Sequence, residues 1–257
     1  MGKLKISSLM IALSVTWLGG CSSEQEAIEL NVSAASSLQE VTTELAEQFM
    51  ENHPHVNVHL NFAGSNQLQQ QIVEGFPVDI FMSAHVDPHQ ALVDIGLVNE
   101  GGMFATSPVV LVSSSPEINS VYDLANHNVD LIFAGETVPI GIYTHLILSE
   151  IDLQQSGFRE AVLNNVISRA ANVREALLYV TLNESDATFV YMTDLTEDLL
   201  SELTLIELPE AFQVEGTYYI AVIEQDGISE AATEFYRFVL STEGQEVLEE
   251  YGFNGFR

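Results

Sequence analysis

The sequence predicts an α/β fold of two lobes, each a mostly parallel sheet flanked by helices, with a ligand cleft between the lobes. Strand-like and helix-like patterns alternate along the 257 residues, and this order favours parallel sheets covered by helices. Four strand-to-helix junctions share small or hydroxyl residues, and no low-complexity linker divides the chain. We therefore assign residues 28–107 plus 194–257 to lobe 1 and residues 108–193 to lobe 2.

The first part of the chain alternates three strands with three helices. The expected strands cover residues 28–32, 56–62 and 78–82. The first helix ends at His53-Pro54, because proline cannot continue a helix and restricts the residue before it. The second helix closes at Gly75, a residue suited to a helix C-terminus. The third helix begins at Asp87-Pro88, since proline is tolerated in a first helical turn.

The rest of the chain continues the alternation. The expected strands cover residues 108–112, 130–133, 166–168, 188–191, 203–208 and 218–223. Pro139 suits the first turn of one helix and Asn172 suits the N-cap of another. A further helix is expected to start at Asp194, and two helices over residues 230–240 and 244–251 end the chain.

The four junctions predict an anion site. They lie at residues 33–37, 63–66, 135–141 and 172–173. The first N–H groups of a helix lack intrahelical partners, and the positive end of the helix dipole lies behind them, so each helix start attracts an anion. Loops at the carboxyl ends of parallel strands converge on one crevice. The expected donors are the hydroxyl and N–H groups of Ser37 and Ser65, the N–H groups of Ile140 and Val173, and the hydroxyl of Tyr191.

A site made only of donors restricts the choice of anion. It suits a fully deprotonated ion such as molybdate, tungstate or sulfate, whereas hydrogen phosphate also requires an acceptor for its proton. The chain has 7 Lys+Arg against 37 Asp+Glu, a formal net charge of −30, which excludes a nucleic-acid partner because phosphate backbones require basic patches. This charge does not exclude a small anion, because surface charge is screened over about 8 Å at physiological salt and N–H donors act at contact.

The N-terminus has the pattern of an export signal. Lys3 and Lys5 precede an apolar run that is too short to span a bilayer, and small residues follow it just before Cys21, the only cysteine. This pattern resembles a bacterial lipoprotein signal, in which the cysteine is acylated. We therefore expect a signal peptide over residues 1–20 and a lipidated tether over residues 21–27. The protein would then be exported and held on the periplasmic or cell-surface side of a membrane.

Several short motifs carry a family resemblance. They are AASSL at 34–38, FAGS at 62–65, PVDIFMSA at 77–84, ETVPIGIY at 136–143, NVREAL at 172–177 and VY at 190–191. Together they resemble the periplasmic molybdate-binding proteins of ABC transport systems, the molybdate and tungstate family of type II substrate-binding proteins. The resemblance covers residues 28–253. It implies a monomer without a cofactor that closes on molybdate or tungstate and delivers the ion to an ABC permease. The implied oxyanion contacts are Ser37, Ser65, Ile140, Val173 and Tyr191.

Two departures from the family pattern are present, and two alternative ligands remain open at this stage. Ile140 stands where the family usually has alanine, which leaves the shape of the cavity open, and Asn172 stands where it usually has aspartate. The same fold could bind sulfate instead. It could also bind a metal ion through His53, His55 and His59 with His85 and His89; His55 and His59 are expected to share a strand face, and His85 and His89 could share a helix face. Catalytic motifs such as Gly-x-Ser-x-Gly, His-Glu-x-x-His or a dinucleotide glycine pattern are absent from the sequence, so we expect no enzyme.

Overall fold

The computed structural model describes residues 27–224 and 229–255. The expected signal peptide, Cys21 and the tether as far as residue 26 lie outside these residues. Within the described part of the chain, no helix is both long and apolar enough to cross a membrane.

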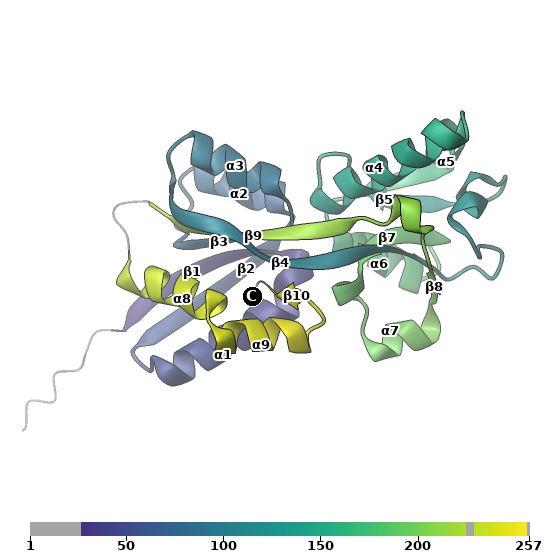
Figure 1. Ribbon diagram of the computed structural model, residues 1–257. Helices are drawn as coiled ribbons and strands as arrows, with labels where there is room; N and C mark the ends of the chain where they lie inside the picture. The colour runs from purple at the N-terminus through teal and green to yellow at the C-terminus, as the bar shows by residue number, and fades with distance from the viewer. Residues whose placement is uncertain (1–26, 225–228, 256–257) are drawn as a thin grey trace, which may run out of the picture.

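Lobe 1 is built on three parallel strands in the order β2-β1-β3. These are β1 (Ile28–Ala35), β2 (Val56–Ala63) and β3 (Ile80–Ser83). One face carries helices α1 (Gln39–Asn52), α8 (Glu230–Leu240) and α9 (Thr242–Glu250), and the other carries α2 (Ser65–Val73) and α3 (Val86–Asp94) (Figure 1). The expected β-α-β-α-β order of this region is therefore confirmed.

Two long antiparallel strands connect the lobes. They are β4 (Val98–Ser113) and β9 (Glu215–Ile223). Strand β9 pairs with β3 in lobe 1, whereas β4 pairs at its far end with β7 of lobe 2. Figure 1 shows both strands running from one lobe into the other. The expected strand over residues 108–112 is thus only the end of β4, because the glycines at 101 and 102 hide the strand pattern in the sequence.

Lobe 2 repeats the layered arrangement. Its strands are β5 (Leu131–Ala134), β6 (Val166–Ala170) and β7 (Ala187–Tyr191), with β5 parallel to both neighbours. Helices α4 (Pro139–Gln154) and α5 (Phe158–Asn164) lie on one face, and α6 (Val173–Thr181) and α7 (Glu197–Glu202) lie on the other (Figure 1). The remaining elements are the short strands β8 (Thr204–Ile206) and β10 (Asn254–Gly255), both paired with β4, and the 3-10 turns η1 (Ser36–Leu38), η2 (Val121–Ala125), η3 (Met192–Asp194) and η4 (Glu210–Phe212).

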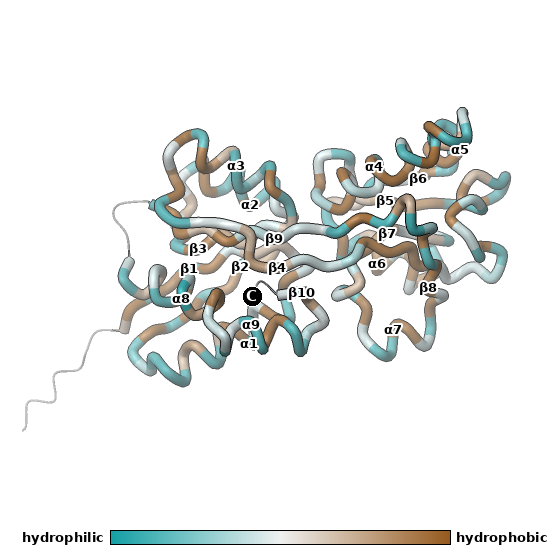
Figure 2. The backbone as a smooth tube through the Cα atoms, viewed as in Figure 1, coloured by the Kyte–Doolittle hydropathy of each residue, from teal (hydrophilic) through white to brown (hydrophobic). Residues whose placement is uncertain are grey.

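The largest core cluster is continuous through both lobes. It contains β1 and α1 residues such as Leu30 and Phe49, as well as β7 and α4 residues such as Phe189 and Leu148. A smaller cluster lies beneath α2 and α3. Figure 2 shows the hydrophobic residues concentrated along the strands of each lobe, with hydrophilic residues frequent on the helices. Burial of this apolar area is the main favourable term in folding.

The prediction of a helix that starts at Asp194 is wrong. Asp194 ends the turn η3 instead, and its carboxylate accepts a hydrogen bond from the N–H of Tyr191 at 3.0 Å. Helix α7 begins three residues later at Glu197, with Thr196 as its N-cap. The reason is that the carboxylate of Asp194 caps the preceding turn and not a following helix.

Helix α4 offers a matched test of the core. Leu148 is fully buried, whereas Leu153 on the same helix is 81% exposed. We expect Leu148→Ala to lower the free energy of unfolding by about 2–5 kcal/mol, because it removes buried methyl groups and leaves a cavity. Leu153→Ala should change it by no more than about 0.5 kcal/mol. Urea denaturation measures both, and equal losses would contradict the placement of α4.

Candidate anion-binding site

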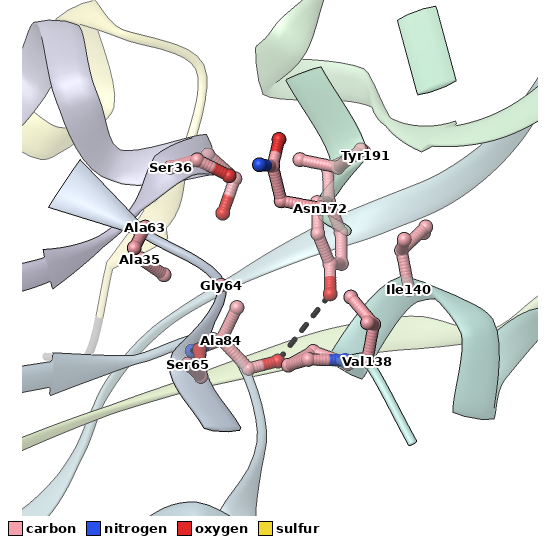
Figure 3. A pocket seen from close by; sticks show the side chains of 13 residues that line it. Ala35, Ser36, Ala63, Gly64, Ser65, Ala84, Val138, Ile140, Asn172 and Tyr191 are labelled. Atoms are coloured by element: carbon pink, nitrogen blue, oxygen red, sulfur yellow. Dashed lines mark hydrogen bonds between the residues drawn. The ribbon is translucent and has the colours of Figure 1, made fainter. Parts of the chain in front are cut away.

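A small pocket lies between the two lobes. Its cavity volume is about 10 Å³, which is room for about one water molecule. Figure 3 shows residues of lobe 1 facing residues of lobe 2 across it. The pocket is lined by Ala35, Ser36, Ser37, Ala63, Gly64, Ser65, Ala84, Val138, Pro139, Ile140, Asn172, Val173 and Tyr191. The structure thus brings together all five residues that the sequence predicts as anion contacts.

The pairing of parallel strands explains why the junctions meet. Ala35 at the end of β1 lies opposite Ala63 at the end of β2. Likewise, Ala134 at the end of β5 lies opposite Ala170 at the end of β6. In each lobe two strands therefore end at the same level, and the helices that follow start side by side. The small alanine side chains leave space where the chains turn.

The helix starts leave their N–H groups available. Three of the four N-cap residues, Ala35, Gly64 and Val138, make no side-chain capping hydrogen bond. Asn172 is the exception, as its side chain accepts from the N–H of Glu175 at 3.0 Å, which confirms the expected cap. Since the first N–H groups of a helix have no intrahelical partner, those of η1, α2 and α4 are free of side-chain caps at the pocket.

The hydroxyl of Ser37 is the least satisfied polar group of the site. The residue is 3% exposed, and its Oγ has no hydrogen-bond partner among the described residues. It lies close enough to the hydroxyl of Tyr218 to lower the pKa of that group, without hydrogen-bond alignment, while burial raises that pKa far more. A buried hydroxyl without a partner is costly, so Ser37 is ready to donate to a bound anion.

Ser65 and Tyr191 approach each other through Ala84. The Oγ of Ser65 accepts from the N–H of Ala84 at 3.1 Å, and its own hydrogen remains to be donated. The hydroxyl of Tyr191 donates to the carbonyl of Ala84 at 3.4 Å, the dashed line in Figure 3. Burial raises the pKa of Tyr191 well above its usual 10, so the phenol stays protonated and remains a donor at neutral pH.

Two glycines allow the close approaches around the pocket. A Cβ on Gly64 would lie 2.8 Å from the carbonyl oxygen of Ala171, in the opposite lobe. A Cβ on Gly141 would lie 2.0 Å from the carbonyl oxygen of Gly135. The first approach lets the lobes touch, and the second lets the start of α4 pack against the end of its strand.

The apolar residues contribute backbone and shape. Ile140 and Val173 are 1% and 4% exposed, and each lies in the first turn of its helix. Among the described residues that line the pocket, none carries a formal charge. The arrangement is a ring of neutral hydroxyl and N–H groups around a small space, with apolar side chains between them. Such a ring can hold a small anion, but it offers no base, nucleophile pair or cation for a reaction.

Comparison with known proteins places the chain in a family. Over residues 30–254 the sequence matches the family described as bacterial extracellular solute-binding protein. The chain belongs to this family.

The relatives of this solute-binding protein agree with the sequence resemblance. The molybdate-binding protein ModA of Mycobacterium tuberculosis is 29% identical over 261 residues, which cover 96% of each chain. The putative ABC transporter substrate-binding lipoprotein YvgL of Bacillus subtilis is 28% identical and covers 97% of this chain and 98% of its own. Both relatives are named for binding: one for molybdate, the other for the substrate of an ABC transporter.

Solved structures support the same fold. The substrate-binding domain of a putative molybdenum ABC transporter from Clostridium difficile is 28% identical, with a TM-score of 0.64 over 90% of this chain and all of that one. The periplasmic molybdate-binding protein of Azotobacter vinelandii has a TM-score of 0.75 over 89% of this chain and all of its own. At 19% identity the second match concerns the fold alone. The predicted type II binding-protein fold is confirmed.

In the part of the chain that the structure describes, the histidines of the solute-binding protein do not gather into a cluster of metal ligands. Among the described residues, no group of three or more histidine, cysteine, aspartate or glutamate side chains is arranged to hold a metal ion. His59 pairs with Glu29 on the surface. His85 is the N-cap of α3, and its ring packs edge-on against Tyr143. The ring of His89 packs against Tyr219. The structure therefore gives no support to the cation alternative.

Sequence reasoning missed two charged residues next to the pocket. Asp194 is 1% exposed, and its carboxylate lies 3.2 Å from the Nε of Arg174. Burial raises the pKa of Asp194 from 3.8 to about 7, against the opposing effects of Arg174 and of the Tyr191 N–H. The spacing of Tyr191 and Asp194, three residues apart after a strand, is the sequence signal for this cap.

The pKa of Asp194 predicts how stability depends on pH. Between about pH 4 and pH 7 the folded protein holds this proton and the unfolded chain does not, so the contribution of Asp194 to stability falls as pH rises through that window. In Asp194→Asn this part of the slope should be absent. The free energy of unfolding, measured in urea across the window, tests this, with Asp198→Asn on exposed α7 as the control.

A wild-type profile that runs parallel to that of Asp194→Asn would show that Asp194 ionises normally in the folded protein. The pH profile of Asp198→Asn should run parallel to that of wild type, because this exposed substitution leaves the buried Asp194 unchanged.

Proposed function

We propose that this protein captures molybdate or tungstate between its two lobes and delivers the ion to an ABC permease. The observation that carries the proposal is the pocket of uncharged donors at four helix starts, two from each lobe. Its proposed contacts are Ser37, Ser65, Ile140, Val173 and Tyr191. Relatives named as molybdate-binding proteins along almost the whole chain support the choice of ligand.

The chemistry of the donors favours a tetrahedral dianion. Its four oxygens accept hydrogen bonds in diverging directions, and the donors of the pocket come from both sides. The hydroxyl of Tyr191 has a single hydrogen, so it must turn from the carbonyl of Ala84 to the anion when the anion binds. The described lining of the pocket contains no carboxylate to accept a proton from the anion, and burying a proton that is poorly paired is costly. Charge-assisted hydrogen bonds to N–H groups are stronger than neutral ones, so a dianion can be held without a cation.

Binding would be coupled to closure of the lobes. We assign residues 28–107 plus 194–257 to lobe 1 and residues 108–193 to lobe 2, except that α7 and β8 lie with lobe 2, where β8 pairs with the end of β4. Strands β4 and β9 pass between the lobes. An anion that touches donors of both lobes contacts more of them in the closed arrangement than in an open one. It therefore shifts the population toward the closed arrangement by this difference in affinity. No cofactor enters this scheme, and a monomer suffices for it.

Anchoring completes the proposed role. A lipid on Cys21, followed by the short tether, would hold the protein beside the permease on the outer side of the membrane after residues 1–20 are removed. A relative described as a substrate-binding lipoprotein supports this part of the proposal.

A titration of the mature protein tests the ligand. Molybdate or tungstate at a hundredfold excess over its dissociation constant should raise the free energy of unfolding by about 2.7 kcal/mol. Calorimetry with molybdate, tungstate and sulfate measures the affinities directly, and phosphate near neutral pH should bind far more weakly than all three. Tight binding of sulfate alone would change the assigned ligand. Absence of any oxyanion response at millimolar concentration would overturn the proposed function.

Substitution of Ser37 separates affinity from stability. In Ser37→Ala the dissociation constant for molybdate should rise about 10- to 100-fold, the value of a hydrogen bond to a charged group. The stability of the ligand-free protein should stay equal or increase, because a buried hydroxyl without a partner is removed. Ser149→Ala removes a hydroxyl on α4 that donates a hydrogen bond to the backbone carbonyl of His145. This control should leave the affinity unchanged. An unchanged affinity in Ser37→Ala would remove Ser37 from the site.

A further inference from the structure

Arg174 lies at the centre of a polar network just behind the pocket. It follows Val173 in the first turn of α6 in lobe 2. Its Nη1 donates to the carboxylate of Glu40 at 2.9 Å, and its Nη2 donates to the second oxygen of the same group. Glu40 belongs to α1 of lobe 1. The guanidinium therefore makes a two-pronged contact across the cleft, a geometry that arginine forms and lysine cannot.

The same guanidinium also reaches the turn that carries Tyr191. Its Nε lies 3.2 Å from Oδ1 of Asp194, an ion pair without hydrogen-bond alignment. The other oxygen of Asp194 accepts from the N–H of Tyr191 at 3.0 Å. Asp194 is fully buried, and an isolated buried carboxylate would be costly. Arg174 thus supports the group that fixes the backbone of Tyr191.

The network joins three segments of the proposed anion site. Glu40 lies one turn after Ser37, Arg174 is adjacent to Val173, and Asp194 lies three residues after Tyr191. Neither Glu40, Arg174 nor Asp194 lines the pocket. Their effect on a ligand must therefore act through the residues that they hold in place.

We propose that Arg174 is a positioning residue of the anion site, which raises anion affinity by linking α1, α6 and the turn after β7 in the closed arrangement. The inference rests on the proposed function and names the residues that stabilise its closed form. The Arg174–Glu40 contact spans the two lobes, so it forms when they close and is lost when they separate. The free energy of this contact therefore contributes to anion affinity and not to the folding stability of either lobe.

A plain surface ion pair would behave differently. Glu40 is 47% and Arg174 26% exposed in their side chains, and pairs of this exposure contribute little to folding. If the contact were only such a pair, its removal would change neither stability nor anion affinity. If it links the lobes, its removal leaves stability unchanged and weakens binding.

The decisive variant is Glu40→Gln, because Glu40 is half exposed and its loss leaves the buried Asp194 with its partner. The melting temperature of the ligand-free variant should match that of wild type. Its dissociation constant for molybdate should rise about three- to tenfold, through faster dissociation, as expected for the loss of one exposed but bidentate charge pair. Glu47→Gln is the matched control, since Glu47 is an exposed acid on the same helix, and its affinity should equal that of wild type.

Substitutions of Arg174 test the same network a second time. In Arg174→Gln the affinity should fall further than in Glu40→Gln, because the support of Asp194 is lost as well. Arg174→Lys should recover part of the affinity, and Glu40→Gln should add nothing in the Arg174→Gln background. Sodium chloride should weaken binding to wild type relative to Glu40→Gln, because salt screens the pair that the variant lacks.

The outcomes separate the inference from the proposed function. A wild-type protein that binds none of the oxyanions overturns both. A wild type that binds molybdate, with Glu40→Gln equal to it in affinity and in dissociation rate, overturns only the role of Arg174. A fall in the melting temperature of Glu40→Gln that accounts for its loss of affinity would also overturn that role.

Discussion

The structure depends on one constraint, that parallel strands in each lobe end at the same level with small residues. Ala35 opposite Ala63 and Ala134 opposite Ala170 satisfy it. Because the strands end together, the helices that follow start together, and their unpaired N–H groups point into one space. Larger side chains at Ala35 or Ala63, which line the pocket, would fill it, and a shift in strand register would separate the helix starts. The anion site is thus a consequence of how the sheets are paired.

The neutral lining of the pocket explains how an acidic protein could bind an anion. The chain carries a formal charge of −30, but the lining of the pocket is neutral, and the solvated acids act through a screening medium. Hydrogen-bond donors act at contact and in a drier environment, where each is worth more. Arg174 lies behind the lining and not in it, so its charge holds segments together while the donors meet the ligand.

Continuous strands, a hydrophobic core shared by both lobes and specific backbone and side-chain contacts hold the two lobes together. Strands β4 and β9 run continuously between them, and Gly64 permits a backbone contact with Ala171 that any side chain would block. The other links are polar contacts such as those of Tyr191 with Ala84 and Arg174 with Glu40. The proposed closure would bring these polar contacts together while the two strands stay continuous.

Local sequence determined the elements and the donors. Alternating patterns and helix-start residues such as Pro139 and Asn172 act over a few residues, so most strands and helices could be predicted. The same holds for the positions of Ser37, Ser65, Ile140 and Val173 at helix starts and of Tyr191 at a strand end. Only the tertiary structure decided that β4 extends back to Val98, that Asp194 caps the turn of Tyr191, and that Arg174 meets Glu40, 134 residues away in the chain. These features depend on strand pairing and side-chain contacts between distant segments, and such contacts leave no periodic signal in the sequence.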